Sequence, residues 1–488
     1  MLATWLDDAL REIRGADPVA VVTGITLASD RVLPGDLFVA IDGAREHGAT
    51  YAPQAIAAGA AAVLTDPAGA ELAGELPVPV LVVQAPRAVI GGLAARLYGE
   101  PALALTLVAV TGTQGKTTTT RLGEGALLAA GVPAAVIGTV GTRINGEEVA
   151  SSLTTPEAPD LHALFAVMVE RGVRVCMMEV SSHALVMGRV DGVVFDVACF
   201  TNLGRDHLDF HADEEAYFAA KASLFTPERA RRGLVNADDA HGRRLLDAEP
   251  SIPMASYALE EPAEWQAIDV VSAPAATTFV VSHGDARYRS TVPLPGSYNV
   301  SNALCAVAAC GEAGLDPAAV AAGLADSEGV PGRLERVDAG QPYLAVVDYA
   351  HKPDAVEAAL TAVRPQTRRR LIVVIGAGGD RDAGKRPLMA ATAAALADIV
   401  VITDDNPRSE DPSAIRAAMR AGIPADTAAQ VHEVGDRRAA IRLAVSLAEE
   451  GDALVVAGKG HEKGQEIDGT VYPFDDREVL VEEIRAAR

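Results

Sequence analysis

The sequence contains little cysteine and no long apolar run. Only four cysteines occur among 488 residues, and no two of them form a C-x-x-C pair. This usage argues against a disulfide framework, and apolar neighbours predict buried, reduced thiols in a cytoplasmic protein. No segment reaches the roughly 18 apolar residues of a membrane span. The first residues, MLATWLDDALREIRG, are acidic where a secretory signal is apolar. The four cysteines are Cys176, Cys199, Cys305 and Cys310.

Basic residues are also scarce. The chain has 42 Lys and Arg against 66 Asp and Glu, a formal net charge of −24. Non-specific nucleic-acid binding needs clustered cations, so we expect no nucleic-acid partner. A few local cations can still bind a phosphate in an acidic protein. Because 49% of the residues are hydrophobic and 22% are charged, the chain is expected to fold around buried cores.

Short apolar runs alternate with Ala-rich helical stretches, which predicts an α/β fold. The length is typical of two to four domains of about 100–200 residues. We predict three units, with limits at residues 1–101, 102–333 and 334–488. The middle unit should hold a mainly parallel sheet with antiparallel segments within 260–295. In the third unit, strand candidates end in Gly, Asp or Asn, where open α/β sheets gather ligands.

The most informative segment is LVAVTGTQGKTT, residues 107–118. Leu107 to Val110 predicts a buried strand, and a helix-like segment follows the glycine turn. Backbone N–H groups of such a turn can face an anion at a helix N-terminus. Lys116 offers a charge for phosphates, and Thr117 offers a hydroxyl for Mg²⁺. The loop is two residues shorter than G-x-x-x-x-G-K-[ST], so an ordinary glycine turn with a solvated lysine remains an alternative on this pattern alone.

Two further side chains are candidate Mg²⁺ ligands. Glu179 lies where a predicted strand ends, beside the glycine loop if the sheet is parallel. A carboxylate at that edge can hold Mg²⁺ against a nucleotide. His207, in the segment TNLGRDHLDFH, is a candidate second ligand. A single histidine of this kind is more often structural, so both interpretations stay open on the residue alone.

Taken together, ten ordered motifs resemble those of the Mur ligase family, over essentially the whole chain. They are GTQGKTT, EVSSHAL, TNLGRDHLDFH, AAKASLF, GSYNVSNALCAVA, VPGRLERV, VVDYAHKPDA, GGDRDAGKRPLM, TDDNPR and AGKGHE. The resemblance implies an N-terminal UDP-sugar domain, a central P-loop ATPase and a Rossmann-like C-terminal domain for the amino acid. The acidic surface is compatible with a monomer, which we expect. The ATP-binding residues that the resemblance implies are Gly112, Thr113, Gln114, Gly115, Lys116, Thr117, Thr118 and Asn299.

The family's reaction is an ATP-driven amide ligation through an acyl phosphate. The resemblance implies catalytic roles for Lys116, Lys221 and His207. It implies two Mg²⁺ ions with Thr117, Glu179, His207 and Lys221 as ligands. Lys221, in AAKASLF, matches the lysine that the family carbamoylates with CO₂. That carbamate is an anion able to bridge a second Mg²⁺.

The motifs most resemble those of the member that adds the third residue of the peptidoglycan stem peptide. Within the family, the DNPR element goes with meso-diaminopimelate. Arginine suits this substrate, because diaminopimelate differs from lysine by a distal carboxylate that a guanidinium binds bidentately. The implied amino-acid contacts are Arg381, Asp405, Asn406, Pro407, Arg408, Gly458 and Glu462. The implied contacts to UDP-N-acetylmuramoyl-L-alanyl-D-glutamate are Leu27, Ser29, Thr154, Thr155, Ser181, Met187 and Arg189.

Several positions depart from the family pattern. Gln114 replaces a usual asparagine, Met187 a glutamine, and Lys352 a threonine in DYAHKPD. Asp30 replaces a usual arginine, and Ala28 stands where an acidic residue is common. An anion near a diphosphate weakens its binding. A related ligase acting on a different carboxylate or amino acid therefore remains an alternative.

Overall fold

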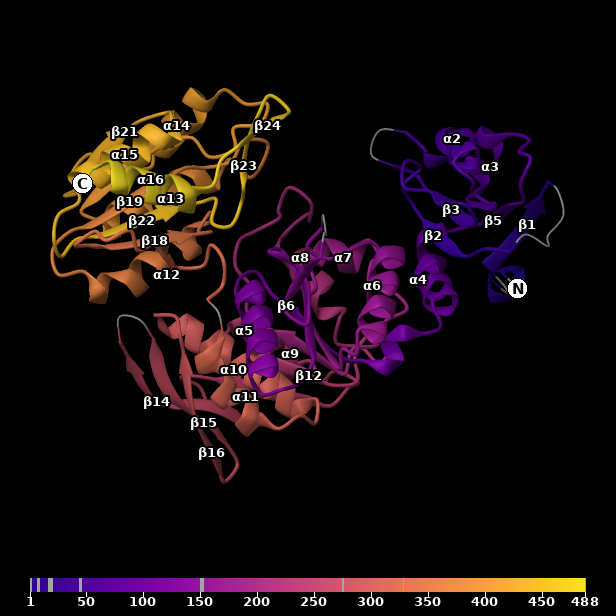
Figure 1. The fold of residues 1–488 in the computed structure, drawn as a ribbon, viewed down its shortest axis with the longest axis horizontal. Coiled ribbons are helices and arrows are strands. Elements are labelled where there is room, and N and C mark those ends of the chain that lie inside the picture. Colours follow the sequence, from indigo (N-terminus) through magenta and orange to yellow (C-terminus); the bar gives the residue numbers. More distant parts are fainter. Residues whose placement is uncertain are drawn as a thin grey trace.

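The chain forms three α/β domains, each around its own sheet (Figure 1). This computed structural model describes residues 2–6, 9–15, 21–43, 46–149, 153–273, 276–327 and 329–487. The N-terminal and C-terminal domains lie on different sides of the middle domain (Figure 1). Within the described ranges, no helix has the length and apolarity needed to cross a membrane. The α/β prediction is confirmed, whereas the limits at residues 101 and 333 stay predictions.

The N-terminal domain has a five-stranded sheet in the order β1-β5-β4-β3-β2. All neighbours are parallel except β1 and β5. Its strands are β1 (Leu10–Arg14), β2 (Gly24–Thr26), β3 (Asp36–Ala40), β4 (Ala62–Thr65) and β5 (Val80–Val83). Its helices are α1 (Leu2–Leu6), α2 (Ala52–Ala57), α3 (Pro67–Ala73) and α4 (Pro86–Leu97).

The middle domain has an eleven-stranded sheet in the order β16-β15-β14-β13-β12-β11-β6-β10-β7-β8-β9. Strands β14 to β7 in this order pair in parallel, and antiparallel ribbons extend both edges. The strands are β6 (Thr106–Thr111), β7 (Ala134–Gly138), β8 (Gly141–Ile144), β9 (Glu147–Val149), β10 (Val175–Glu179), β11 (Val197–Phe200), β12 (Gly233–Asn236), β13 (Met254–Ala258), β14 (Trp265–Ser272), β15 (Thr277–His283) and β16 (Ala286–Val292). The helices are α5 (Lys116–Ala129), α6 (Ala158–Glu170), α7 (Ser182–Val186), α8 (Glu214–Ala222), α9 (Ala240–Asp247), α10 (Ser297–Glu312) and α11 (Pro317–Gly323).

The C-terminal domain has a six-stranded sheet in the order β17-β18-β22-β19-β20-β21, parallel except for β17. A separate antiparallel ribbon is formed by β23 and β24. The strands are β17 (Glu335–Arg336), β18 (Leu344–Asp348), β19 (Leu371–Ile375), β20 (Ile399–Ile402), β21 (Gln430–Glu433), β22 (Ala453–Ala457), β23 (Gly464–Ile467) and β24 (Thr470–Pro473). The helices are α12 (Pro353–Val363), α13 (Lys385–Leu396), α14 (Pro412–Arg420), α15 (Arg437–Leu447) and α16 (Asp476–Ala486).

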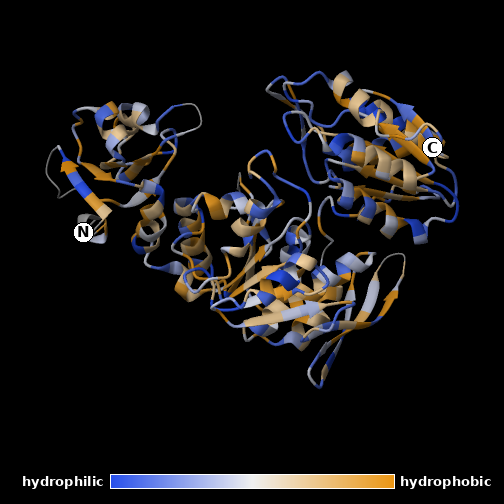
Figure 2. Cartoon of the chain, turned by 180° about the vertical axis from the view of Figure 1, so that it is seen from behind, coloured by the Kyte–Doolittle hydropathy of each residue, from blue (hydrophilic) through white to orange (hydrophobic). Residues whose placement is uncertain are grey.

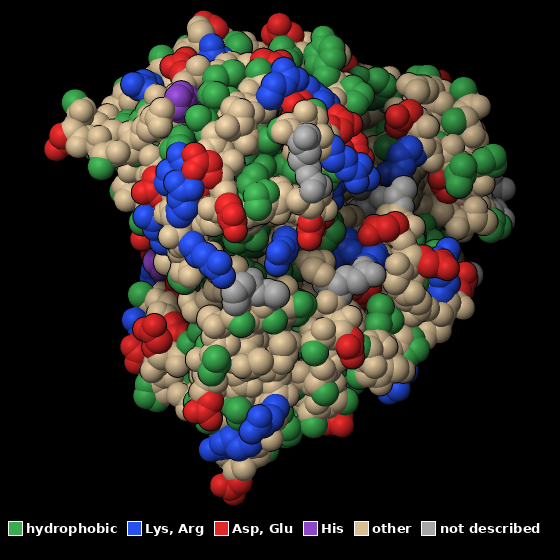
Figure 3. Space-filling model, turned by 60° about the vertical axis from the view of Figure 1, so that its left-hand side comes forward, with side chains coloured by type: hydrophobic (Ala, Val, Ile, Leu, Met, Phe, Trp, Pro, Cys, Tyr) green, Lys and Arg blue, Asp and Glu red, His purple; other side chains and the backbone are tan. Residues whose placement is uncertain are grey.

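Apolar strands, buried on both faces, form the cores (Figure 2). In the middle domain, α5, α10 and α11 cover one face of the sheet, and α6, α8 and α9 cover the other. Helix α10 is rich in alanine, which allows it to pack closely against α5. All four cysteines are free and buried, as predicted. Acidic and basic side chains are interspersed on the surface that Figure 3 shows. Exposed ion pairs contribute only about 0–1 kcal/mol each to stability. The buried apolar cores therefore stabilise the fold more than the surface charges do.

Parallel pairing decides where the predicted site residues lie. Strand β6 lies between β10 and β11 in the sheet. The loops that follow these three strands therefore meet at the carboxyl edge of the sheet. These loops carry Gly112 to Gly115, Ser181, and Thr201 to His207.

Candidate active site

The glycine loop joins β6 to α5 and has a backbone shape that glycine alone adopts easily. The φ angles of Gly112 and Gly115 are +145° and +86°. A Cβ on Gly112 would lie 1.9 Å from Thr201 Oγ1, and one on Gly115 would lie 2.4 Å from Asn302 Oδ1. Helix α5 begins at Lys116, directly after this turn. The loop thus has the strand–turn–helix arrangement that suits a phosphate.

Two lysines converge on the backbone of this loop. Lys116 Nζ donates to the carbonyl oxygens of Gly112 and Thr113, at 2.7 and 3.1 Å. Lys221 Nζ, from α8, donates to the same Gly112 oxygen at 2.9 Å. Its side chain is buried, and the ammonium lies 4.4 Å from the centre of the Tyr217 ring. One carbonyl therefore accepts from both amines.

Desolvation and repulsion by neighbouring cations lower the pKa of both amines. Desolvation and the nearby Lys352 lower the pKa of Lys116 to about 8. Burial, Lys116 and Lys352 lower the pKa of Lys221 well below its ordinary value. A polyanionic ligand would relieve this repulsion, so the loop fits a polyphosphate.

The predicted metal ligands lie on two neighbouring loops. Glu179 ends β10 beside Val110 of β6, and its carboxylate accepts from Thr139 N at 2.8 Å and from Thr139 Oγ1 at 3.1 Å. His207 Nε2 lies 3.0 Å from Asp206 Oδ2. The His207 ring packs 6.0 Å from the ring of Tyr217, which also contacts Lys221. The structure thus brings His207 and Lys221 together around one tyrosine.

The donors around the loop suit Mg²⁺ better than a transition metal. Across the described residues, no group of three or more His, Cys, Asp or Glu side chains could hold a metal ion by itself. Mg²⁺ commonly uses one or two carboxylates, and substrate phosphates supply further oxygens. The Glu179 carboxylate and the buried Thr117 hydroxyl provide such oxygen donors. The residues present therefore fit Mg²⁺ held jointly with a nucleotide.

A cavity of about 180 Å³ opens beside the glycine loop. Its lining includes Gln114, Gly115 and Thr118 of the loop and helix α5, with Asn299 from α10. Asn299 Nδ2 donates to Pro295 O at 2.7 Å. Arg333 also lines this cavity, and its Nε is buried without a hydrogen-bond partner. The lining beside the loop is mostly polar and includes one cation, Arg333, which suits a nucleotide.

The residues implied for the muramoyl dipeptide form one network beside Glu179. Thr154 Oγ1 lies 3.1 Å from Thr139 Oγ1, and Thr155 Oγ1 donates to Glu179 O at 2.9 Å. Ser181 Oγ accepts from Ala184 N and so caps α7.

An arginine extends this network away from Glu179. Arg189 Nη1 donates to Thr155 O at 3.3 Å, and Arg189 Nη2 lies 3.3 Å from Met187 Sδ. Arg189 Nε also lies 2.8 Å from Glu157 Oε1. Met187 thus brings a thioether to this point of the network, where the family resemblance leads us to expect a glutamine.

Leu27 and Ser29 follow β2 in the N-terminal domain, away from the glycine loop. They belong to the side of that domain that meets α6, where Arg31 pairs with Asp160 at 2.8 Å. Asp30, which precedes Arg31 in the sequence, is exposed. Ala28 N donates to Thr26 Oγ1.

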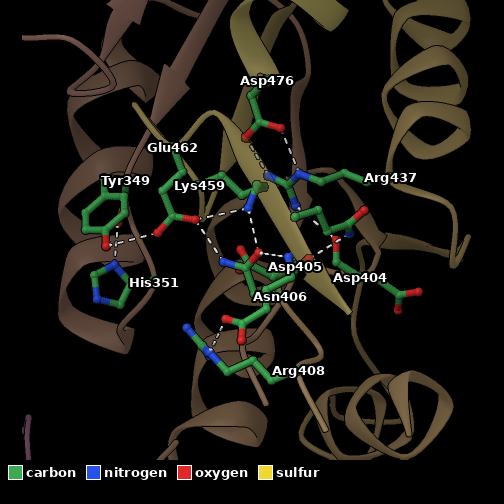
Figure 4. Close-up of polar contacts among 12 residues, drawn as sticks. Tyr349, His351, Asp404, Asp405, Asn406, Arg408, Arg437, Lys459, Glu462 and Asp476 are labelled. Carbon is green, nitrogen blue, oxygen red and sulfur yellow. Dashed lines mark hydrogen bonds and ion pairs between the residues drawn. The ribbon is translucent and has the colours of Figure 1, made fainter. Parts of the chain in front are cut away.

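The DNPR residues form a polar network at the carboxyl edge of the C-terminal sheet (Figure 4). Asn406 Nδ2 donates to Glu462 Oε2 at 2.8 Å, and Lys459 Nζ contacts both residues at 2.9 and 3.0 Å. Tyr349 Oη donates to Glu462 Oε1 at 3.3 Å. These contacts fix the Glu462 carboxylate beside Asn406.

Arg408 is held at the edge of this network. Its Nη1 donates to Gly379 O at 2.7 Å, and its Nε donates to Glu466 Oε2 at 3.2 Å. Pro407 precedes it, and Arg408 has a φ of +53°. These contacts orient the guanidinium plane. Its Nη2 has no hydrogen-bond partner within the described ranges.

The other predicted amino-acid contacts differ in how far they join the network. Asp405 Oδ2 is buried without a hydrogen-bond partner. It lies so close to Gly458 that a Cβ there, at a φ of +119°, would be 2.5 Å away. Arg381 is exposed, and its guanidinium makes no hydrogen bond with the described residues. Arg381 is therefore the predicted contact that the structure leaves outside the network.

Sequence reasoning missed several polar residues of these loops. Asn202 Oδ1 accepts from Gln114 N, and Thr201 Oγ1 donates to Gln114 O at 2.6 Å. Tyr217 joins the glycine loop through Thr113 Oγ1, at 3.1 Å. Lys459 lies within the AGKGHE motif, so the motif could have marked it as a site residue. Tyr217, just before AAKASLF, stands four residues ahead of Lys221, one helical turn away.

Comparisons with known proteins agree with this geometry. Family profiles match residues 21–98 (Mur ligase family, catalytic domain), 110–310 (Mur ligase middle domain) and 332–460 (Mur ligase, glutamate ligase domain). The chain is 53% identical to a Streptomyces avermitilis UDP-N-acetylmuramoyl-L-alanyl-D-glutamate–2,6-diaminopimelate ligase, over 99% of this chain and 97% of the relative. It is 48% identical to the protein of that name from Corynebacterium glutamicum, over 96% and 92%.

Solved structures agree as well. A structure with the same protein name has a TM-score of 0.68 and 34% identity, covering 98% of this chain and 97% of its own. Mycobacterium tuberculosis folylpolyglutamate synthase complexed with ADP and AMPPCP, at 20% identity and a TM-score of 0.63, shares the fold over 75% of this chain and 91% of its own.

The fold and these comparisons define an ATP-dependent ligase that works with ATP and Mg²⁺. The chain belongs to the Mur ligase family.

Proposed function

We propose that this ligase joins meso-diaminopimelate to UDP-N-acetylmuramoyl-L-alanyl-D-glutamate in peptidoglycan precursor synthesis. The observation that carries the proposal is the oriented guanidinium of Arg408 beside the Asn406–Glu462 pair. Diaminopimelate has a distal carboxylate and a distal ammonium on one carbon. A guanidinium suits the first and a fixed carboxylate suits the second. Gly458 leaves room beside Asp405 that any larger residue would fill.

The relatives support the same choice of amino acid. Those of Streptomyces avermitilis and Corynebacterium glutamicum are named for 2,6-diaminopimelate. A 45% identical relative from Leifsonia xyli, matched over 96% of this chain and 92% of its own length, is named only as a UDP-N-acetylmuramyl-tripeptide synthetase. Lysine as the substrate would offer no distal carboxylate to pair with Arg408.

The ATP phosphates bind the loop from Gly112 to Thr118 in this proposal. Lys116 pairs with the phosphates and gives up its bonds to the loop carbonyls. Asn299 faces the nucleotide from the adjacent cavity. Phosphoryl transfer depends mainly on positioning and charge stabilisation, so the reaction needs no nucleophile from the protein.

Glu179, His207 and Thr117 would hold one Mg²⁺, and carbamoylated Lys221 would supply an anionic ligand for a second. Burial and nearby cations lower the pKa of Lys221 well below its ordinary value, which favours the uncharged form of the amine. Such an amine can attack CO₂: an N–C bond forms, the nitrogen loses a proton, and a carbamate anion results. Bound Mg²⁺ would neutralise charge on the phosphate oxygens.

The reaction then forms one amide bond for each ATP. An oxygen of the D-glutamyl carboxylate attacks the γ-phosphorus, and the bond to ADP breaks. The amine attacks the resulting acyl phosphate through a tetrahedral intermediate. The carbon–oxygen bond to phosphate then breaks, the nitrogen loses a proton, and phosphate leaves.

The muramoyl dipeptide lies along the middle domain, in contact with Thr154, Thr155, Ser181, Met187 and Arg189. Its uridine reaches Leu27 and Ser29, and Arg381 approaches the amino acid when it binds.

Domain limits near residues 101 and 333 follow the gaps between the three sheets. We also propose a monomer, since one chain supplies every group named. Cytoplasm is its proposed location, where ATP and UDP-linked sugars are made.

One experiment tests this function. Purified protein is incubated with ATP, Mg²⁺, the muramoyl dipeptide and either meso-diaminopimelate or L-lysine, and phosphate release and product mass are measured. We expect a tripeptide product with diaminopimelate and little with lysine. If the protein bound ATP but released no phosphate with either amino acid, the proposal would be contradicted. Equal use of another carboxylate or amino acid would favour a related ligase with a different substrate, to which Asp30 and Met187 point.

A further inference from the structure

One carboxylate of the middle domain is shared between a candidate metal ligand and the C-terminal domain. Lys352 Nζ, at the start of α12, donates to Asp206 Oδ2 at 2.5 Å. The same oxygen lies 3.0 Å from His207 Nε2. Lys352 is 8% exposed, and the Asp206 side chain is 14% exposed. A buried ion pair therefore connects the amino-acid domain to the His207 ring.

The pair lies at the phosphate end of the site. After desolvation, Lys352 is the largest influence that lowers the pKa of Lys116, and it acts in the same sense on Lys221. The ammonium of Lys352 is thus a third cation next to the glycine loop. It differs from the other two because it belongs to the C-terminal domain, after β18.

Histidines that bind metals usually place their second ring nitrogen against a carboxylate or a carbonyl, which fixes the ring. Asp206 makes this contact with His207. A carboxylate that is itself held from its other side orients the ring more firmly, because its rotamer is fixed. Lys352 provides that restraint only when the C-terminal domain is docked.

We propose that Lys352 is a positioning residue: through Asp206 it orients His207, so that docking of the amino-acid domain completes the phosphate and metal site. The inference rests on the proposed function for its chemistry. It makes carboxylate activation depend on the domain that brings the amine. Acyl phosphate formed in an open enzyme would be lost to water, and this arrangement suppresses that loss.

A second ion pair between the same two domains provides a matched control. Arg205 Nε lies 3.2 Å from Asp382 Oδ2, and the Arg205 side chain is 51% exposed. This pair has no contact with His207 among the described residues. If Lys352 acted only as a tether, removal of either pair would have a similar effect.

The test compares Lys352→Ser, Lys352→Arg and Arg205→Gln with wild type. Lys352 is the N-cap residue of α12, and its side chain makes no capping hydrogen bond. Serine suits this position because its hydroxyl can cap the helix. For each protein we would measure kcat and KM for the amino acid, the thermal midpoint, and Mn²⁺ binding by electron paramagnetic resonance with a non-hydrolysable ATP analogue. Mn²⁺ here reports on the Mg²⁺ site.

For Lys352→Ser we expect kcat and Mn²⁺ affinity to fall by about 10-fold or more, as partners of metal ligands typically cause. KM for the amino acid should stay near wild type, whereas the thermal midpoint should fall, because Asp206 loses a largely buried partner. Lys352→Arg should restore most of the losses in kcat and Mn²⁺ affinity, and Arg205→Gln should behave as wild type. Unchanged kcat and Mn²⁺ binding in Lys352→Ser would overturn the inference, as would an equal loss in Arg205→Gln. If wild type formed no product, the proposed function would fail, whereas Mn²⁺ binding would still decide the role of Lys352.

Discussion

Replacing Arg408 with lysine tests how the amino acid is chosen. The substitution keeps the positive charge, and the backbone φ of +53° burdens both residues equally. The guanidinium is now held by Gly379 O at 2.7 Å and by Glu466 at 3.2 Å. A lysine ammonium cannot keep both contacts and also present two parallel donors to a carboxylate.

The expected loss follows from those contacts. A hydrogen bond to a charged group contributes about 1.5–3 kcal/mol, and lysine forfeits one such bond to the distal carboxylate. A loss of about 2 kcal/mol corresponds to about 30-fold in affinity. Since Arg408 lies in the C-terminal domain and the glycine loop lies in the middle domain, this loss should fall on the amino acid alone.

The assay is steady-state phosphate release with meso-diaminopimelate or ATP varied in turn. We expect KM for diaminopimelate to rise by about 30-fold, with kcat and KM for ATP within about twofold. Arg420→Lys, at the exposed end of α14, is the matched control and should behave as wild type. A parallel rise in KM for ATP, or an unchanged KM for diaminopimelate, would refute this role of Arg408.

Three further changes test other parts of the site. Lys221→Ala should abolish most turnover, and short carboxylic acids should restore part of it by replacing the carbamate; no rescue at any acid concentration would contradict that role. Since the pKa of Lys116 is lowered to about 8 and phosphates favour its charged form, ATP binding above pH 8 should take up a proton and weaken as pH rises. Calorimetry in buffers of different ionisation enthalpy measures this uptake, and binding without it would count against the assignment. Gly458→Ala would place a Cβ 2.5 Å from Asp405 Oδ2 and should cost about 1–3 kcal/mol of stability, with a raised KM for the amino acid. Gly469→Ala, at a φ of +73° with open space around it, should leave KM unchanged; equal KM effects would remove Asp405 from the pocket.

Most of the sheet architecture could be predicted because buried strands leave a strong signal. Runs such as Leu371–Ile375 are wholly apolar and end in glycine or polar residues. The hairpin of β8 and β9 was missed, although its turn is Asn145–Gly146, with φ angles of +51° and +84°. Asn-Gly between two strands is a strong hairpin signal. The strands themselves are short and polar, so the alternation was weak.

The motif residues were placed on the expected loops, but the contacts between them could not be derived from spacing. Lys221 and Gly112 are 109 positions apart, and their bond exists only because α8 lies beside the glycine loop. The bond between Lys352 and Asp206 joins two domains across 146 positions. Local patterns carry no information about such pairs, which depend on how the domains dock.

The ribbon of β23 and β24 stands outside the six-stranded sheet, yet it carries Glu466, the partner of Arg408. Every residue of β24 is exposed. Substitutions there leave the apolar core untouched, so they cost little folding stability. Changes in this ribbon can thus alter how the Arg408 guanidinium is held, while the glycine loop of the middle domain stays the same.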